Sequence, residues 1–127
     1  MKRWAAIIVI AASLLSACGA AAARLARAED SYDQARYETA LSWLEDLERD
    51  VPSLNQGQRA RFYYTRGMTE YRLGHRDEAL YFLAVAREIA GEDDVGLREE
   101  QNELLTRTLG ELTPTAPLTH HARAQGE

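Results

Sequence analysis

The sequence predicts an all-helical domain, and two observations lead to this expectation. Prolines occur only at positions 52, 114 and 117 of the 127 residues, and no stretch alternates β-branched with polar residues as a half-buried strand does. Apolar side chains recur instead at steps of three and four residues, which places them on one face of a helix. We therefore expect about five helices joined by short turns.

The amino-terminal residues 1–17 have the layout of a secretory signal peptide. Two basic residues precede a short apolar stretch over residues 5–15, and small residues follow it. The sequence LSAC, which ends at Cys18, resembles the lipobox of bacterial lipoproteins. This resemblance implies that the signal peptide is cleaved off, that Cys18 receives a diacylglyceryl group and that its new amino group is acylated, so that residues 18–20 form a lipidated amino terminus. Two or more acyl chains anchor a protein stably to a membrane.

Two other roles for this region stay open. Residues 4–23 carry no charge and are about as long as a membrane-spanning helix, so an uncleaved anchor is one alternative and ordinary signal cleavage is another. Cys18 is the only cysteine, so no disulfide forms within the chain. Gly19 follows it, whereas many lipoproteins of the inner membrane have aspartate there. By this resemblance we expect a lipid-anchored protein of the outer membrane that faces the periplasm.

The charge balance argues against nucleic acid as a partner. The chain has 20 acidic and 15 basic residues, for a formal net charge of −5, and its basic residues form no stripe. An acidic domain repels a phosphate backbone. The remaining length fits one small helical domain over residues 21–112. Residues 113–127 are polar, contain two of the prolines and lack apolar periodicity, so we expect a disordered tail.

The clearest predicted helix covers residues 37–50. Its apolar stripe consists of Tyr37, Ala40, Leu41, Leu44 and Leu47. Pro52 ends it, because proline cannot continue the hydrogen-bond ladder of a helix. The next helix runs to about Leu73, and it starts either at Asn55 or with a capping box that begins at Ser53.

Glycines and an acidic cluster mark the remaining boundaries. Gly74 separates the second helix from a third, which Gly91 ends. We expect the acidic residues 92–94 at the start of the last helix, where negative charge is favourable. They lack the spaced loop ligands of a calcium site. The apolar stripe of the last helix consists of Leu97, Leu104, Leu105, Leu109 and Leu112.

Two segments of the chain are similar to each other at an offset of thirty-nine residues. The sequence YDQARYETALSWL at residues 32–44 aligns with YRLGHRDEALYFL at residues 71–83, and both have the same spacing from tyrosine to alanine to leucine. We therefore expect each segment to belong to a helical hairpin with the same internal packing.

The second segment, with the residues before it, resembles the tetratricopeptide repeat (TPR) family. The matching residues are Tyr63, Gly67, Gly74, Ala79, Leu83 and Ala86. Gly67 and Ala79 are small, so two helices can cross closely there. The pattern is broken where Arg66 replaces the usual leucine and where Glu70 stands at a position that is often tyrosine. The resemblance implies a short TPR-like α-solenoid of about two helical hairpins over residues 21–91, with the last helix as a C-terminal cap.

In TPR proteins the first helix of each pair lines a concave groove that binds peptides or partner helices. By this resemblance, the residues expected to face a partner are Tyr32, Arg61, Tyr64, Met68, Tyr71 and Arg72. Tyrosine, methionine and arginine are enriched at the centres of protein interfaces. The same aromatic side chains are also compatible with the core of a hairpin, so both interpretations stay open.

No arrangement of residues indicates catalysis, a metal site or a cofactor. The three histidines, His75, His120 and His121, fall in a turn and in the tail, and an adjacent pair supplies too few ligands for a structural or catalytic metal site. We therefore predict a non-enzymatic, membrane-anchored adaptor that binds an unidentified protein or peptide in its groove. The alternatives are a pilotin-like or envelope-assembly factor and a structural spacer, and self-association is compatible with so few repeats.

Overall fold

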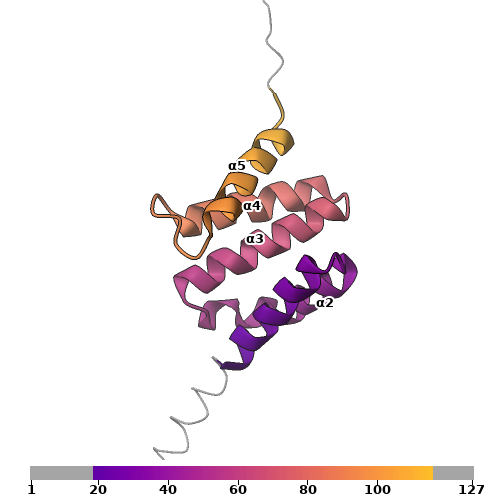
Figure 1. Ribbon diagram of the computed structural model, residues 1–127, viewed down its shortest axis with the longest axis vertical. Coiled ribbons are helices and arrows are strands. Elements are labelled where there is room, and N and C mark those ends of the chain that lie inside the picture. Colours follow the sequence, from indigo (N-terminus) through magenta and orange to yellow (C-terminus); the bar gives the residue numbers. More distant parts are fainter. Residues whose placement is uncertain (1–18, 116–127) are drawn as a thin grey trace, which may run out of the picture.

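The computed structural model describes residues 19–115, and every regular element within this range is helical (Figure 1). The first helix covers residues 19–33. It is followed by α2 (Tyr37–Leu47), the short 3-10 helix η1 (Glu48–Ser53), α3 (Gln56–Arg72), α4 (Arg76–Ala90) and α5 (Glu99–Leu112). The prediction of an all-helical fold is confirmed for these residues. The expected signal peptide, the lipidation site Cys18 and the tail from residue 116 onward, with His120 and His121, lie outside the described residues.

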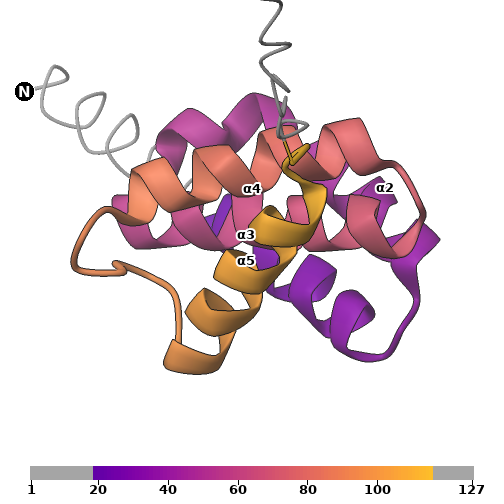
Figure 2. The same cartoon turned by 90° about the horizontal axis from the view of Figure 1, so that it is seen from above.

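The helices are stacked in the order of the chain, from the first helix at one end of the domain to α5 at the other (Figure 1, Figure 2). α3 and α4 pack against each other, α2 contacts α3, and α5 contacts α4. Because α3 is covered on several sides, residues 64–70 are all buried. Within residues 19–115, no helix is both long and apolar enough to span a membrane.

Two hydrophobic clusters meet at α3. The first consists of Ala21, Leu25, Ala28, Leu44, Leu47, Val51, Leu54 and Phe62. The second consists of Tyr64, Met68, Ala79, Leu83, Ala86, Leu105 and Leu112. Phe62 of α3 belongs to the first cluster, whereas Tyr64 and Met68, from the same helix, belong to the second. α3 therefore connects the two halves of the domain, each of which removes apolar surface from water.

The helices α3 and α4 approach most closely at Gly67. A Cβ atom at this position would lie 2.6 Å from Cγ and 2.9 Å from the backbone nitrogen of Leu83. Only a residue without a side chain fits, because the nitrogen belongs to the rigid backbone of α4. Ala79, the other small residue expected at this crossing, is completely buried. The pair α3 and α4 thus forms a tightly packed hairpin.

A buried ion pair links charged residues of α3. Arg66 and Glu70 are only 8% and 3% exposed, and Nε of Arg66 donates to Oε1 of Glu70 over 2.9 Å. The other carboxylate oxygen of Glu70 lies 2.6 Å from Nδ1 of His75, which lies between α3 and α4 as expected and whose side chain is 52% exposed. The guanidinium of Arg66 also stands 4.8 Å from the ring centre of Phe82. The pair occupies two of the positions at which the sequence departs from the pattern that it resembles.

The boundary between α2 and α3 differs from the expected one. The α-helix ends at Leu47, and the chain continues as the 3-10 helix η1 with Pro52 inside it. The proline stops the α-helical hydrogen bonding before its own position, because it has no N–H group to donate. Asn55 caps α3: its Oδ1 accepts from the backbone N–H of Gln58 over 2.9 Å, and its own N–H donates to Oε1 of Gln58 over 3.0 Å. Of the two starts considered, Asn55 and Ser53, the helix starts at Asn55, which forms a capping box with Gln58.

The acidic residues 92–94 do not lie at the start of the last helix, so that prediction was wrong. They belong to the turn over residues 91–96, and the acidic residues in the first turn of α5 are Glu99 and Glu100. Gly96, with a φ of +84°, permits a longer loop than was expected. Asp94 nevertheless contacts the helix, because its Oδ2 accepts a hydrogen bond from the side chain of Asn102 over 2.9 Å.

Candidate binding groove

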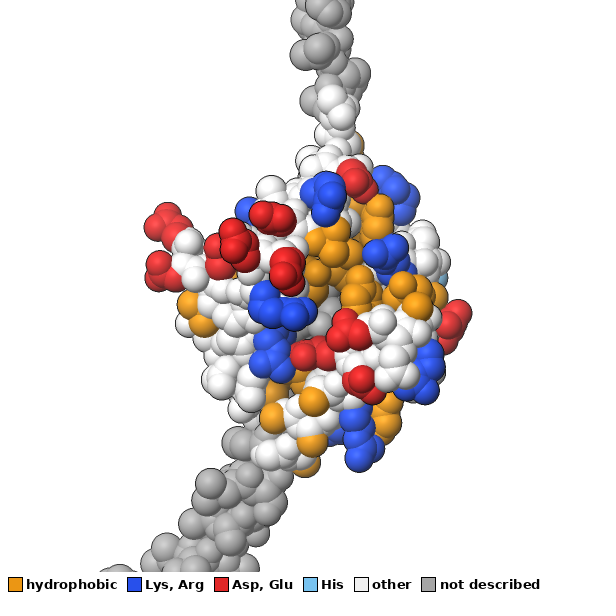
Figure 3. All heavy atoms as spheres, in the orientation of Figure 1, with side chains coloured by type: hydrophobic (Ala, Val, Ile, Leu, Met, Phe, Trp, Pro, Cys, Tyr) orange, Lys and Arg blue, Asp and Glu red, His pale blue; other side chains and the backbone are white. Residues whose placement is uncertain are grey.

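A groove of about 380 Å³ lies between the first helix, α3 and the start of α5. Its lining residues are Glu29, Asp33, Arg61, Gly96, Arg98 and Gln101. A smaller hollow of about 80 Å³ shares four of these residues and adds Tyr32, Tyr64 and Thr65. We treat the two as one feature, the inter-helix groove. Figure 3 shows positive and negative side chains close to one another around the middle of this side of the domain.

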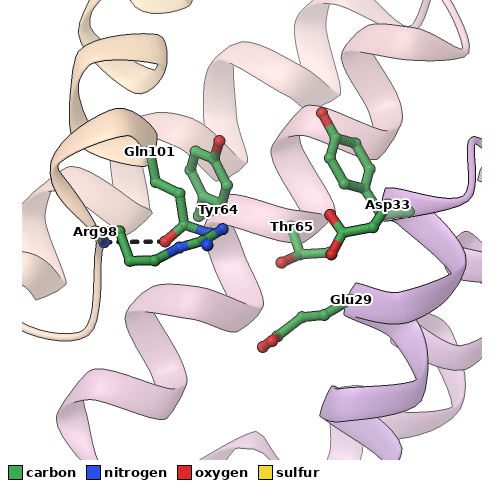
Figure 4. Close-up of a pocket in the computed structure, with 7 residues that line it drawn as sticks. Glu29, Asp33, Tyr64, Thr65, Arg98 and Gln101 are labelled. Carbon is green, nitrogen blue, oxygen red and sulfur yellow. Dashed lines mark hydrogen bonds between the residues drawn. The ribbon is translucent and has the colours of Figure 1, made fainter.

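Each wall of the inter-helix groove uses side chains that share one face of a helix. Glu29, Tyr32 and Asp33 follow one another at steps of three and one, and α3 repeats this spacing with Arg61, Tyr64 and Thr65. On α5, Arg98 and Gln101 are three residues apart. Side chains three or four residues apart project from the same side of a helix, as Glu29 does with Tyr32 and with Asp33. Figure 4 shows Glu29 and Asp33 on the first helix, opposite Arg98 and Gln101.

A contact between two glycines holds the start of α5 beside α3. A Cβ atom at Gly96 would lie 2.6 Å from the carbonyl carbon of Gly57, in the first turn of α3. The backbones of the loop and of α3 therefore touch, and this contact positions Arg98 at the groove. Such a contact joins residues that are far apart in the sequence, so local periodicity gives no sign of it.

The charges of the inter-helix groove divide into a paired set and an unpaired set. Nε and Nη2 of Arg61 each lie 2.9 Å from Oε1 of Glu29, which neutralises both groups. Asp33 and Arg98 form no ion pair with any described residue, although they line the same hollow. The backbone N–H of Arg98 donates to Oε1 of Gln101 over 3.0 Å, at the start of α5, and the guanidinium of Arg98 makes no hydrogen bond to a described residue. Two uncommitted charges of opposite sign thus remain on opposite walls.

The floor of the inter-helix groove carries two hydroxyl groups on side chains that are otherwise mostly buried. Tyr64 and Thr65 are only 4% and 3% exposed as whole residues, and their hydroxyl oxygens, which are not fully enclosed, make no hydrogen bond to another described residue. Burial raises the pKa of Tyr64 from 10.0 to about 12, because the charged form would lose its hydration. Buried polar groups nearly always have a partner. The two hydroxyl groups are therefore positioned to bond to a molecule or to water in the groove.

Three of the six residues expected to face a partner line the groove, namely Tyr32, Arg61 and Tyr64. Met68 is completely buried in the second hydrophobic cluster, so its side chain offers no surface to a partner. Tyr71 is half buried, and its hydroxyl donates to Oε2 of Glu111 on α5 over 2.8 Å. Neither of these two residues lines the groove. Arg72 is exposed, again outside that lining.

The sequence did not predict the other six lining residues. These are Glu29, Asp33, Thr65, Gly96, Arg98 and Gln101. A signal for some of them was present, because Glu29 and Asp33 flank Tyr32 on its own helical face, as Arg61 and Thr65 flank Tyr64. The prediction was based mainly on aromatic residues, so it did not include the charged residues beside them.

Comparison of the chain with protein-family models, with curated proteins and with solved structures found no match. Within residues 19–115, no group of three or more histidine, cysteine, aspartate and glutamate side chains is arranged to hold a metal ion. The chemistry of the inter-helix groove is that of hydrogen bonding and ion pairing.

Proposed function

We propose that this chain is a membrane-anchored adaptor of the TPR type, which holds a segment of a partner protein in the inter-helix groove at the periplasmic face of the outer membrane. The observation that carries the proposal is the groove itself. Three helices from distant parts of the sequence line it with buried hydroxyls and uncommitted charges, and it provides no arrangement of groups that suggests bond making.

The packing of the helices supports the TPR part of the proposal. α3 and α4 cross closely at Gly67, as the resemblance implies, and the first helix and α2 share the first hydrophobic cluster. In this reading the first helix and α2 form one hairpin, α3 and α4 form the next, and α5 is the cap. The first helix, α3 and α5 then correspond to the groove-lining helices of the family.

The position of the lipobox supports the membrane part. Cys18 directly precedes residue 19, the first described residue, and residues 19–33 are helical. At a rise of about 1.5 Å per residue, Asp33 lies about 20 Å along that helix from residue 19. A lipid on Cys18 would therefore hold the groove close to the bilayer, where it suits segments of membrane proteins or of other envelope proteins.

The proposal is tested by purifying the full-length protein from membranes with and without the Cys18→Ser substitution. We expect the wild-type protein to fractionate with membranes and to retain one partner in stoichiometric amount. We expect Cys18→Ser to lose membrane association or to remain an uncleaved precursor, because it removes the thiol that would receive the lipid. A mature Cys18→Ser protein that stays on membranes would contradict the anchor, and a wild-type protein with no partner would support a spacer instead.

A further inference from the structure

We propose that the inter-helix groove selects its peptide by the order of two charges: a lysine or arginine of the partner contacts Asp33, and an aspartate or glutamate of the partner contacts Arg98. This inference rests on the proposed function and specifies the chemistry of the partner segment. The occupant is an extended stretch of polypeptide that places both charges between the first helix and α5.

Asp33 and Arg98 both line the groove, and neither forms an ion pair with another described residue. Both line the smaller hollow and the larger one, whereas Arg61 and Glu29, which line the larger one with them, neutralise each other over 2.9 Å. Figure 4 shows that Asp33 comes from the first helix and Arg98 from the start of α5, on opposite sides of Tyr64 and Thr65. A ligand between these walls therefore meets negative charge on one side and positive charge on the other.

Asp33 and Arg98 both interact electrostatically with Tyr64 on the floor of the groove. Asp33 raises the pKa of Tyr64 and Arg98 lowers it, in addition to the larger effect of burial. The fields of the two side chains therefore reach the same buried hydroxyl from opposite sides. An occupant that displaces water from the groove would strengthen both interactions, because charges attract more strongly in a medium of low dielectric constant. Charge complementarity of this kind favours specificity and orientation.

The hydroxyl groups on the floor of the groove favour a polypeptide as the occupant. Tyr64 and Thr65 are only 4% and 3% exposed as whole residues, and their hydroxyls, which are not fully enclosed, make no hydrogen bond to a described residue. A peptide backbone offers both N–H donors and C=O acceptors at regular intervals, so it can bond to hydroxyls that act in either way. Bonds to the main chain would also fix its direction in the groove, and a fixed direction is what makes the order of the two charges matter.

The test uses synthetic peptides of one composition that carry a single lysine and a single glutamate among alanine, serine and glycine. The two charges are separated by several spacings, and each spacing is made in both orders. We expect the full-length protein, in detergent or in liposomes, to bind one order roughly tenfold more tightly than the other at the best spacing. The double variant Asp33→Arg with Arg98→Glu is expected to prefer the opposite order.

Two controls keep this test decisive. The double variant Glu103→Arg with Arg107→Glu exchanges exposed charges on α5 outside the groove, so its preference should equal that of the wild type. The neutral double variant Asp33→Asn with Arg98→Gln keeps the size of the side chains and should bind both orders equally, which provides a second readout if the charge exchange disturbs folding.

The inference is overturned if the wild type binds both orders equally, if it binds neither, or if the exchanged variant keeps the wild-type preference. These outcomes are distinct from failure of the proposed function. A protein that retains a stoichiometric partner from membranes yet shows no preference for charge order would remain an adaptor, but it would not select by these two residues.

Discussion

Replacing Glu70 with alanine is expected to lower the free energy of unfolding by about 3–5 kcal/mol, because it leaves the charge of Arg66 buried without its partner. Arg66 is only 8% exposed, and its closest carboxylate other than Glu70 belongs to Glu45, at 3.7 Å and on a largely exposed side chain. One nitrogen of Arg66, Nη1, is already buried without a hydrogen bond to a described residue. The substitution would therefore add a second unsatisfied charge-bearing group to the junction of α2, α3 and α4.

Urea denaturation followed by circular dichroism measures this loss. The matched control is the double variant Arg66→Leu with Glu70→Leu, which removes both charges and places an apolar side chain at each position. We expect it to be far closer in stability to the wild type than Glu70→Ala, because replacing a whole buried ion pair is often neutral. If Glu70→Ala were as stable as the wild type, the pair would not be buried as described.

Replacing Gly67 with leucine is expected to cost about 3 kcal/mol or more, at the upper end of the range for overpacking. Even the first carbon of the new side chain would lie 2.9 Å from the backbone nitrogen of Leu83, so α3 and α4 would have to move apart. For a domain of this size, each kilocalorie per mole lowers the melting temperature by roughly 4–8 °C. We expect the variant to melt at least 12 °C below the wild type, or to lose cooperative unfolding.

Gly110→Leu is the control for this substitution. Gly110 is exposed on α5, and no atom lies within 4 Å of a Cβ placed there. Leucine favours a helix over glycine by somewhat less than about 1 kcal/mol, so this variant should be as stable as the wild type or slightly more so. Thermal unfolding by circular dichroism compares the two. Equal melting temperatures for Gly67→Leu and Gly110→Leu would show that the helices do not cross closely at Gly67.

The helices could be predicted because their signal is local. The stripe that includes Ala40, Leu44 and Leu47 has helical spacing, and all three side chains are buried in α2. The close approach of two helices at Gly67 was predictable from the resemblance to the helical hairpin of the TPR family. The boundaries were less accurate, because a 3-10 helix and a loop with Gly96 depend on contacts that helical periodicity does not encode.

The inter-helix groove was predictable only in part. Aromatic residues such as Tyr32 and Tyr64 suggested a binding face, whereas the unpaired charges of Asp33 and Arg98 depend on which other charges find partners in the fold. Arg66 and Glu70 show the reverse case: they looked like departures from a repeat pattern. Their spacing of four residues is that of an ion pair on one helix, and the structure shows that the two side chains form such a pair and are buried.

The most direct measurement of the central claim is photo-crosslinking from the groove in membranes. A photoreactive phenylalanine analogue is placed at Gln101, which lines the groove, or at Glu103, which is exposed on the same helix and does not line it. Binding of a partner segment in the inter-helix groove predicts one specific crosslinked protein from position 101 and none of it from position 103. Identical products from both positions, or no product from position 101 in a correctly folded and membrane-bound protein, would contradict the adaptor function.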